Sequence, residues 1–376
     1  MAAATDSALP GFPVELSPDA IDRELASMWK QRGSEGGDES PGVTRIALGN
    51  IIWLASTRHR DHARRVFANL VQHYPSRLIL LEYHEEWENP EVEAFVNAQC
   101  FRSHEIRGEV CCEEIVLRFG ACAFRHIANA VLSLLLPDVP TTFCYISALP
   151  HRYVELIEAI GAMADHTLTE ATLLDDPVQG LREMAEGTAC AGTLSWFRYT
   201  PIRDQIAAVF DDRNCGALLS SISGVRIKWC GGGGIEALTS ASLLVGWMAS
   251  RLGWKPGAAS WPFHFESSAG PVSVEFLRCE PEEEEGEAVL AEIEILCATG
   301  DRVRLLQSER RGFLERVLDG PSQLCEGKPM YVKTRPLDEA QAVVLSLNTT
   351  ATNPVFRHAA RLAAPVLESA LKRLNS

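Results

Sequence analysis

The protein has 376 residues, of which 46% are hydrophobic and 23% are charged. This composition is typical of a folded protein, and the length suggests about two domains. The formal charge of −15 at pH 7 repels phosphate backbones and anionic lipids, which argues against nucleic-acid and membrane partners. The sequence opens without a basic region followed by an apolar core, and no run reaches the roughly 18 apolar residues of a membrane span. We therefore expect a cytoplasmic protein.

The first predicted element is an amphipathic helix. Ser17, Pro18 and Asp19 provide a capping oxygen, a proline for the first turn and an early acid, which together favour a helix start. Four apolar residues then recur on one helical face: Ile21, Leu25, Met28 and Trp29. Residues 31–42 are rich in glycine and charge and predict a flexible linker. Residues 1–42 are thus expected to form an N-terminal helix and linker.

An α/β domain is expected at residues 43–190, because apolar runs alternate with helical periodicity along this stretch. The expected strands lie at 46–55, 78–81, 114–119, 141–146 and 166–174. The expected helices lie at 60–72, 124–136 and 153–163. Strands joined through helices form βαβ units, so the sheet should be largely parallel and covered by helices on both faces.

The rhythm changes near residue 175, and we expect a second domain, of mixed α/β or α+β class, at residues 191–376. Two helices, at 178–186 and 201–210, bridge toward it. The further elements expected are strands at 225–230, 262–266, 272–278, 290–297 and 302–307 and helices at 237–252 and 356–374. Both domains therefore mix strands with helices.

The most distinctive segment is residues 194–203, Leu-Ser-Trp-Phe-Arg-Tyr-Thr-Pro-Ile-Arg, which matches no catalytic motif. Its aromatic and guanidinium groups are the kind that recur at protein interfaces, so Trp196, Arg198, Thr200 and Arg203 are candidate partner-binding residues. In the alternative interpretation, Trp196 belongs to the core and Arg203 only opens a helix.

Two further sites are candidates for binding anions or a partner. Arg58 and Arg60 lie in a basic cluster where the first expected strand meets its helix, which is the usual binding edge of an α/β sheet. Ser76 and Arg77 stand before the next strand. A nucleotide- or sugar-phosphate-binding enzyme or sensor is therefore an open alternative. The glycine run 231–234 is a weaker phosphate-binding candidate, since it lacks a P-loop lysine.

The eleven cysteines include no Cys-x-x-Cys pair and no cluster with structural-zinc spacing. We expect reduced, mostly buried thiols and no metal or cofactor. A redox pair is an open alternative among four of them: Cys100, Cys111, Cys112 and Cys122. No metallohydrolase or serine-hydrolase motif is present in the sequence, so we assign no catalytic residue.

Four segments together resemble the glucose-6-phosphate dehydrogenase assembly protein family, OpcA. They are residues 74–77, residues 113–118 leading to 134–140, residues 196–203 and residues 243–254. The resemblance spans about residues 45–255. Tyr74, Cys144-Tyr145 and Ile202 depart from the family pattern, so the chain resembles a divergent member.

The resemblance implies a non-catalytic protein that binds the glucose-6-phosphate dehydrogenase oligomer, promotes its active form and raises its activity in the oxidative pentose phosphate pathway. In some members this activation is redox-sensitive, which would add thioredoxin as a partner.

Overall fold

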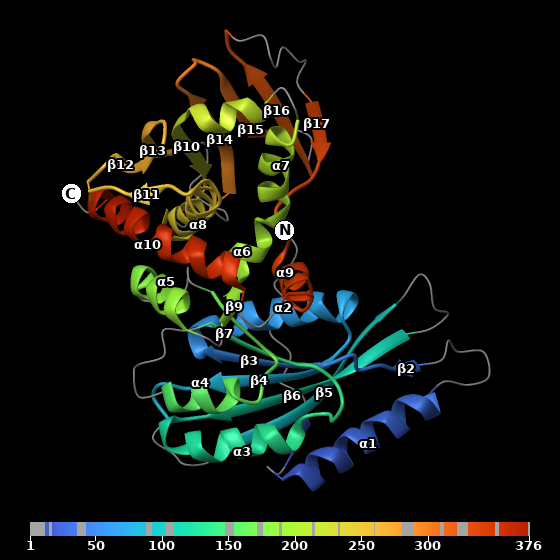
Figure 1. Ribbon diagram of the computed structural model, residues 1–376. Helices are drawn as coiled ribbons and strands as arrows, with labels where there is room; N and C mark the ends of the chain where they lie inside the picture. The colour runs from blue at the N-terminus through green and yellow to red at the C-terminus, as the bar shows by residue number, and fades with distance from the viewer. Residues whose placement is uncertain are drawn as a thin grey trace. The chain divides into compact units, whose positions relative to one another are not determined.

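The computed structural model describes residues 12–14, 17–35, 43–87, 92–102, 109–146, 154–170, 176–187, 190–212, 215–231, 234–258, 260–279, 289–308, 312–321, 330–349 and 353–374 (Figure 1). The chain divides into two compact units. Unit 1 comprises Met1–Glu170, Ala189–Ala191 and Glu339–Ala351, and unit 2 comprises Ala171–Thr188, Gly192–Asp338 and Thr352–Ser376. Residues 171–188 therefore belong to unit 2 although they precede the boundary that we placed at residue 190, and residues 339–351 belong to unit 1 although they follow it.

A sheet organises unit 1, and nine of its strands lie among the described residues. Their bounds are β1 (Phe12–Val14), β2 (Val43–Arg45), β3 (Asn50–Ser56), β4 (Arg77–Tyr83), β5 (Val92–Arg102), β6 (Glu109–Phe119), β7 (Thr141–Ile146), β8 (His166–Thr169) and β9 (Cys190–Thr193). The order is β1-β5-β6-β4-β3-β7-β8-β9, with β2 beside β6. Strands β6, β4, β3, β7 and β8 run parallel, which confirms the expected parallel sheet. Strands β5 and β1 are antiparallel additions at one side.

Helices cover both faces of this sheet (Figure 1). Helix α2 (Arg60–His73) lies on one face, and α1 (Pro18–Glu35), α3 (Phe124–Leu134) and α4 (Val154–Gly161) lie on the other. Helix α9 (Glu339–Ser346) packs on α2. Since both faces are buried, the central strands read as continuous apolar runs, and every residue of β3 and β4 is buried.

The strand order places a topological switch point between β3 and β7. The chain passes from β3 through α2 to β4 on one side, and from β6 through α3 to β7 on the other. In open α/β sheets, ligands bind at the carboxyl ends of the strands beside such a point. The short helix η1 (Thr57–His59), which follows β3, occupies this end.

Unit 2 contains a mixed sheet, with eight strands among the described residues. They are β10 (Ile222–Cys230), β11 (Lys255–Pro256), β12 (Phe263–Ser267), β13 (Gly270–Arg278), β14 (Val289–Cys297), β15 (Arg302–Gln307), β16 (Phe313–Asp319) and β17 (Met330–Lys333). Their order is β11-β12-β13-β10-β14-β15-β16-β17. Among the described strands of unit 2, only the β10–β13 pair is parallel, so the expected mixed α/β class is confirmed.

The helices of unit 2 are α5 (Pro177–Glu186), α6 (Leu194–Arg198), α7 (Thr200–Phe210), α8 (Gly234–Leu252) and α10 (Pro354–Leu374). Helix α10 packs against both α8 and α5. The approach of α8 to α10 requires Gly246, because a Cβ there would lie 2.3 Å from the carbonyl oxygen of Ala359. Short 3-10 helices also occur at η2 (Ala121–Ala123) in unit 1 and η5 (Gly216–Ser221) in unit 2.

In unit 1, the bounds of two expected elements differ from the prediction. Helix α1 continues through Glu35, so residues 31–35 of the expected linker are helical, and residues 36–42 lie outside the described part. The first expected strand begins only at Asn50, because the backbone before it pairs elsewhere: the Ile46 amide donates to the Cys111 carbonyl oxygen and the Leu48 amide to the Pro75 carbonyl oxygen.

Candidate functional site

The segment 194–203 forms a tight helix-turn-helix in unit 2. The Thr193 hydroxyl caps α6 by accepting a hydrogen bond from the Trp196 amide at 3.0 Å. Tyr199 then ends α6 and begins α7, and Pro201 stands in the first turn of α7, where no amide donor is needed. The sequence therefore encodes two helix starts within eight residues, which fixes the direction of both helices.

Arg203 holds this turn together from the inside. Its guanidinium lies 3.6 Å from the centre of the Trp196 ring. It donates to the Trp196 carbonyl oxygen at 2.6 Å and to the Thr200 hydroxyl at 2.8 Å. Burial lowers the pKa of Arg203 to about 9, which leaves the group charged at neutral pH. This charge stabilises the turn through a cation–π contact in a site of low water access.

Trp196 is also internal, with 4% of its surface exposed. Its ring meets Phe356 of α10 edge-on, with centroids 5.4 Å apart. Arg198 is half-buried and crosslinks the turn to two other segments of unit 2, donating to the Leu337 carbonyl oxygen at 3.2 Å and pairing with Glu236 at 3.4 Å. The structure thus brings the four predicted residues together, but as an internal clamp whose half-buried members are Arg198 and Thr200.

Arg58 and Arg60 lie at the carboxyl end of β3, beside the switch point of unit 1. Arg58 is 76% exposed, with Glu85 3.8 Å away. Arg60 is half-exposed and contacts Asp61 at 3.4 Å. Both pairs are solvated and therefore weak, so these guanidiniums can exchange their present partners for carboxylates or phosphates of another molecule.

Ser76 and Arg77 are both buried in unit 1. Arg77 donates through Nε and Nη2 to Glu113, at 2.8 and 2.6 Å, and through Nη1 to the Leu134 carbonyl oxygen. Glu113 also accepts from the indole of Trp29 on α1 at 3.0 Å. With these bonds Arg77 ties β4, β6, α3 and α1 together, and its position makes it a structural group rather than a surface anion ligand.

A second buried carboxylate, Glu82, was missed in the sequence. It sits near the carboxyl end of β4 with no exposed surface, paired with Arg64 at 2.7 Å and Arg118 at 2.7 Å. The available signal was a single acidic residue inside an apolar strand. An acidic side chain that is buried in this way is almost always paired with a basic one. Glu82 thereby holds two arginines in place near the edge where Arg58 and Arg60 lie.

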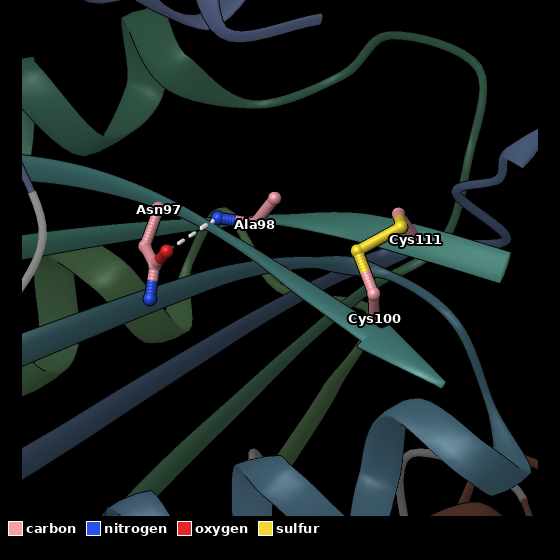
Figure 2. The surroundings of a disulfide bond; sticks show 4 residues. All are labelled: Asn97, Ala98, Cys100 and Cys111. Atoms are coloured by element: carbon pink, nitrogen blue, oxygen red, sulfur yellow. Dashed lines mark hydrogen bonds between the residues drawn. A yellow bond between two sulfur atoms is a disulfide. The ribbon is translucent and has the colours of Figure 1, made fainter. Parts of the chain in front are cut away.

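The expectation of reduced thiols is wrong at four positions. Cys100 on β5 is bonded to Cys111 on β6, and Cys230 on β10 is bonded to Cys279, just after β13. Figure 2 shows the first bond between neighbouring strands. The first bond joins two adjacent strands, and the second joins β10 to the residue that follows its neighbour β13. Such pairings cannot be deduced from cysteine spacing, because strand register decides them.

The other two redox candidates remain single thiols. Cys112 is buried, and desolvation raises its pKa to about 12, which makes it a poor nucleophile. Cys122 is exposed. The Cys111-Cys112 neighbours face opposite sides of β6, so of the four candidates the structure pairs only Cys100 with Cys111.

Two features of unit 2 were also missed in the sequence. On α10, Arg357, His358 and Arg361 line a hollow of about 270 Å³. Their signal was three basic residues within five positions at the start of an amphipathic helix. Under the clamp, a smaller apolar cavity of about 30 Å³ is lined by Tyr199 and Ile202 and by strands β14 to β16. The α10 hollow is an exposed basic feature in a strongly acidic chain.

Two domain models of one family match this chain in succession. The family is described as "Glucose-6-phosphate dehydrogenase subunit". Its N-terminal domain matches residues 67–186, and its C-terminal domain matches residues 191–370. Together the two matches cover most of the chain.

Curated relatives carry the name OxPP cycle protein OpcA. The protein from Synechocystis sp. is 27% identical over 259 residues, covering 67% of this chain and 52% of the relative. The protein from Nostoc punctiforme is 27% identical over 196 residues, covering 51% of this chain and 41% of the relative. The chain spans about half the length of the curated relatives it matches.

One solved structure illustrates a distant resemblance. An oxidoreductase from Sinorhizobium meliloti aligns over 87% of this chain and 99% of its own length, with a TM-score of 0.49 and 9% identity. These values are too low to transfer an activity.

None of the described helices has both the length and the apolar composition that a membrane span requires.

Proposed function

The chain belongs to the glucose-6-phosphate dehydrogenase subunit family, and we propose that it is a non-catalytic subunit that binds the glucose-6-phosphate dehydrogenase oligomer, promotes its assembly and raises its activity. The observation that carries this proposal is the succession of the two family domains over residues 67–370. Relatives named for the OxPP cycle support it.

The activation is allosteric in this proposal. A regulator that binds the active oligomer more tightly than the inactive form shifts the population toward the active one. A coupling free energy of about 1–3 kcal/mol changes a substrate affinity about 5- to 150-fold. Such a regulator therefore needs a complementary surface and a rigid scaffold, and it needs no reacting group of its own.

Arg58 and Arg60 are the proposed direct contacts with the dehydrogenase. Their partners in this chain are weakly held, and guanidiniums bind carboxylates in a defined, bidentate geometry. Trp196, Arg198, Thr200 and Arg203 are proposed to position the surface of unit 2, since their bonds run inward. A redox-dependent change in this activation, with thioredoxin as reductant, belongs to the same proposal.

The test is a glucose-6-phosphate dehydrogenase assay with the enzyme from the same organism, with and without this chain, at varied glucose 6-phosphate. We expect a lower KM or a higher kcat. An Arg58→Ala, Arg60→Ala double variant should bind up to about 30-fold more weakly, because each exposed pair is worth at most about 1 kcal/mol. Arg65→Ala, an exposed arginine further along α2, is the matched control. An unchanged rate at saturating chain would contradict the proposal.

A phosphate-binding sensor is the second candidate, and the basic hollow on α10 favours it. Arg357 is held in place there by the carbonyl oxygens of Ala185 and Glu186, each at 3.2 Å. A sugar phosphate or nucleotide should then raise the melting temperature. At a concentration of 100 times its dissociation constant, the ligand stabilises the folded chain by about 2.7 kcal/mol. Arg361→Ala should abolish this shift, and an equal shift in that variant would exclude the hollow.

A further inference from the structure

The disulfide of unit 1 lies beside a carboxylate that completes a set of metal ligands. Cys100 and Cys111 are directly opposite each other on the antiparallel strands β5 and β6, as Figure 2 shows. Glu109 stands two residues before Cys111 on β6, so its side chain leaves the same face of the sheet. One ligand atom from each of the three residues lies within 4.8 Å of the others.

These distances suit a zinc ion. With Zn–S bonds of about 2.3 Å and a Zn–O bond of about 2.1 Å, a tetrahedral site separates its ligand atoms by roughly 3.5–3.8 Å. The ligand atoms now lie no more than 4.8 Å apart, so small side-chain rotations bring all three into this range once the S–S bond is broken. Thiolates favour zinc over magnesium and calcium, which prefer oxygen ligands.

The three proposed ligands differ in their exposure to solvent. Cys111 has no exposed surface, whereas Cys100 and Glu109 are half-buried. An ion there would be shielded by the sheet on one side and reachable from the other. Three protein ligands leave a fourth position for water.

We propose that Cys100, Cys111 and Glu109 bind one Zn²⁺ ion when the Cys100–Cys111 bond is reduced, so that the same two sulfurs hold either a disulfide or a metal. The cysteine spacing predicts no such site, because the ligands come from two paired strands and meet only through their register. Among the described residues this is the one group of three such side chains with ligand atoms so close together.

The two states are linked by a balanced exchange with a dithiol. A thiolate of the dithiol attacks Sγ of Cys100, the S–S bond breaks, and the sulfur of Cys111 leaves with the electron pair. The second thiol of the dithiol then releases Cys100, and the dithiol ends as a disulfide. Its two protons pass to the two cysteines, and zinc binding expels them to water.

The experiment uses the full chain and zinc alone. The chain is reduced with a phosphine, desalted without oxygen and titrated with Zn²⁺ against a chromophoric chelator, with Mg²⁺ as the control cation. We expect one Zn²⁺ per chain with release of about two protons, and no stoichiometric binding by the oxidised chain. Co²⁺ in place of Zn²⁺ should give the charge-transfer absorbance of thiolate ligands.

Variants assign the site. A Cys100→Ser, Cys111→Ser variant should lose this stoichiometry, whereas a Cys230→Ser, Cys279→Ser variant and Cys122→Ser should keep it. Glu109→Gln should bind at least about tenfold more weakly, since a direct ligand matters no less than an outer-shell partner.

Three results would overturn the proposal: binding that survives the Cys100/Cys111 change, binding equal in the oxidised chain, or an affinity unchanged by Glu109→Gln. If the double variant fails to fold, zinc titrations of the oxidised chain and of Glu109→Gln still test the proposal.

Discussion

Arg203→Ala is expected to destabilise unit 2 by about 2–4 kcal/mol. The substitution removes two hydrogen bonds from a charged donor, to the Trp196 carbonyl oxygen and the Thr200 hydroxyl, each worth about 1.5–3 kcal/mol. It also removes a desolvated cation–π contact worth about 2 kcal/mol. Against this loss of about 5–8 kcal/mol stands the relief of no longer burying a guanidinium, which is several kcal/mol.

Urea unfolding of the full chain measures this difference, together with hydrogen exchange of the α6 and α7 amides, because a chain of two units need not unfold in one transition. Arg251→Ala, an exposed arginine on α8, is the control and should stay within about 0.5 kcal/mol of the unsubstituted chain. Arg203→Lys should be intermediate, because an ammonium cannot stack and make both bonds at once. An Arg203→Ala chain as stable as Arg251→Ala would refute the clamp.

Three further predictions concern buried groups. At pH 8, iodoacetamide should modify Cys122 and spare Cys112, because desolvation raises the pKa of Cys112 to about 12. Mass spectrometry of the modified peptides measures the labelling, and equal labelling of the two cysteines would contradict this prediction. Gly246→Leu should lower the melting temperature by several degrees or prevent folding, because its side chain would overlap Ala359; a melting curve that matches the unsubstituted chain would contradict the close approach. Desolvation raises the pKa of Glu114, so this carboxylate costs stability above its folded-state pKa. Glu114→Gln should therefore stabilise the chain at pH 7, with a gain that shrinks as the pH falls through that pKa toward the unfolded value; a gain that grows at low pH in urea titrations would contradict this sign.

The parallel core of unit 1 was predictable because its strands are buried on both faces. Strands β3 and β4 contain the apolar runs 51–55 and 78–81, which identify them as buried strands. Strand β5 was missed although the sequence carries two strand signals, since Asn97 and Gln99 alternate with apolar residues and the turn signal Asn89-Pro90 precedes the strand. Helix α9 was missed for another reason. It belongs to unit 1, although unit 2 supplies the residues before it.

The candidate site was less predictable, because its character depends on partners distant in sequence. Trp196 was equally consistent with surface and core, and the contact that decides its burial comes from Phe356 on α10. Arg77 looked like an anion ligand until β6 supplied Glu113. The pairing of Cys100 with Cys111 follows only from the register of β5 on β6. The sequence therefore identifies these residues as candidates, whereas their roles follow from contacts with residues distant in the sequence.

Co-elution with the dehydrogenase is the most direct test of the proposed function. Purified chain and glucose-6-phosphate dehydrogenase from the same organism would be mixed and passed over a sizing column with light-scattering detection. We expect a complex heavier than either component and a larger fraction of the dehydrogenase in its assembled form. Separate elution of the two proteins at micromolar concentration, in both oxidised and reduced buffer, would contradict it.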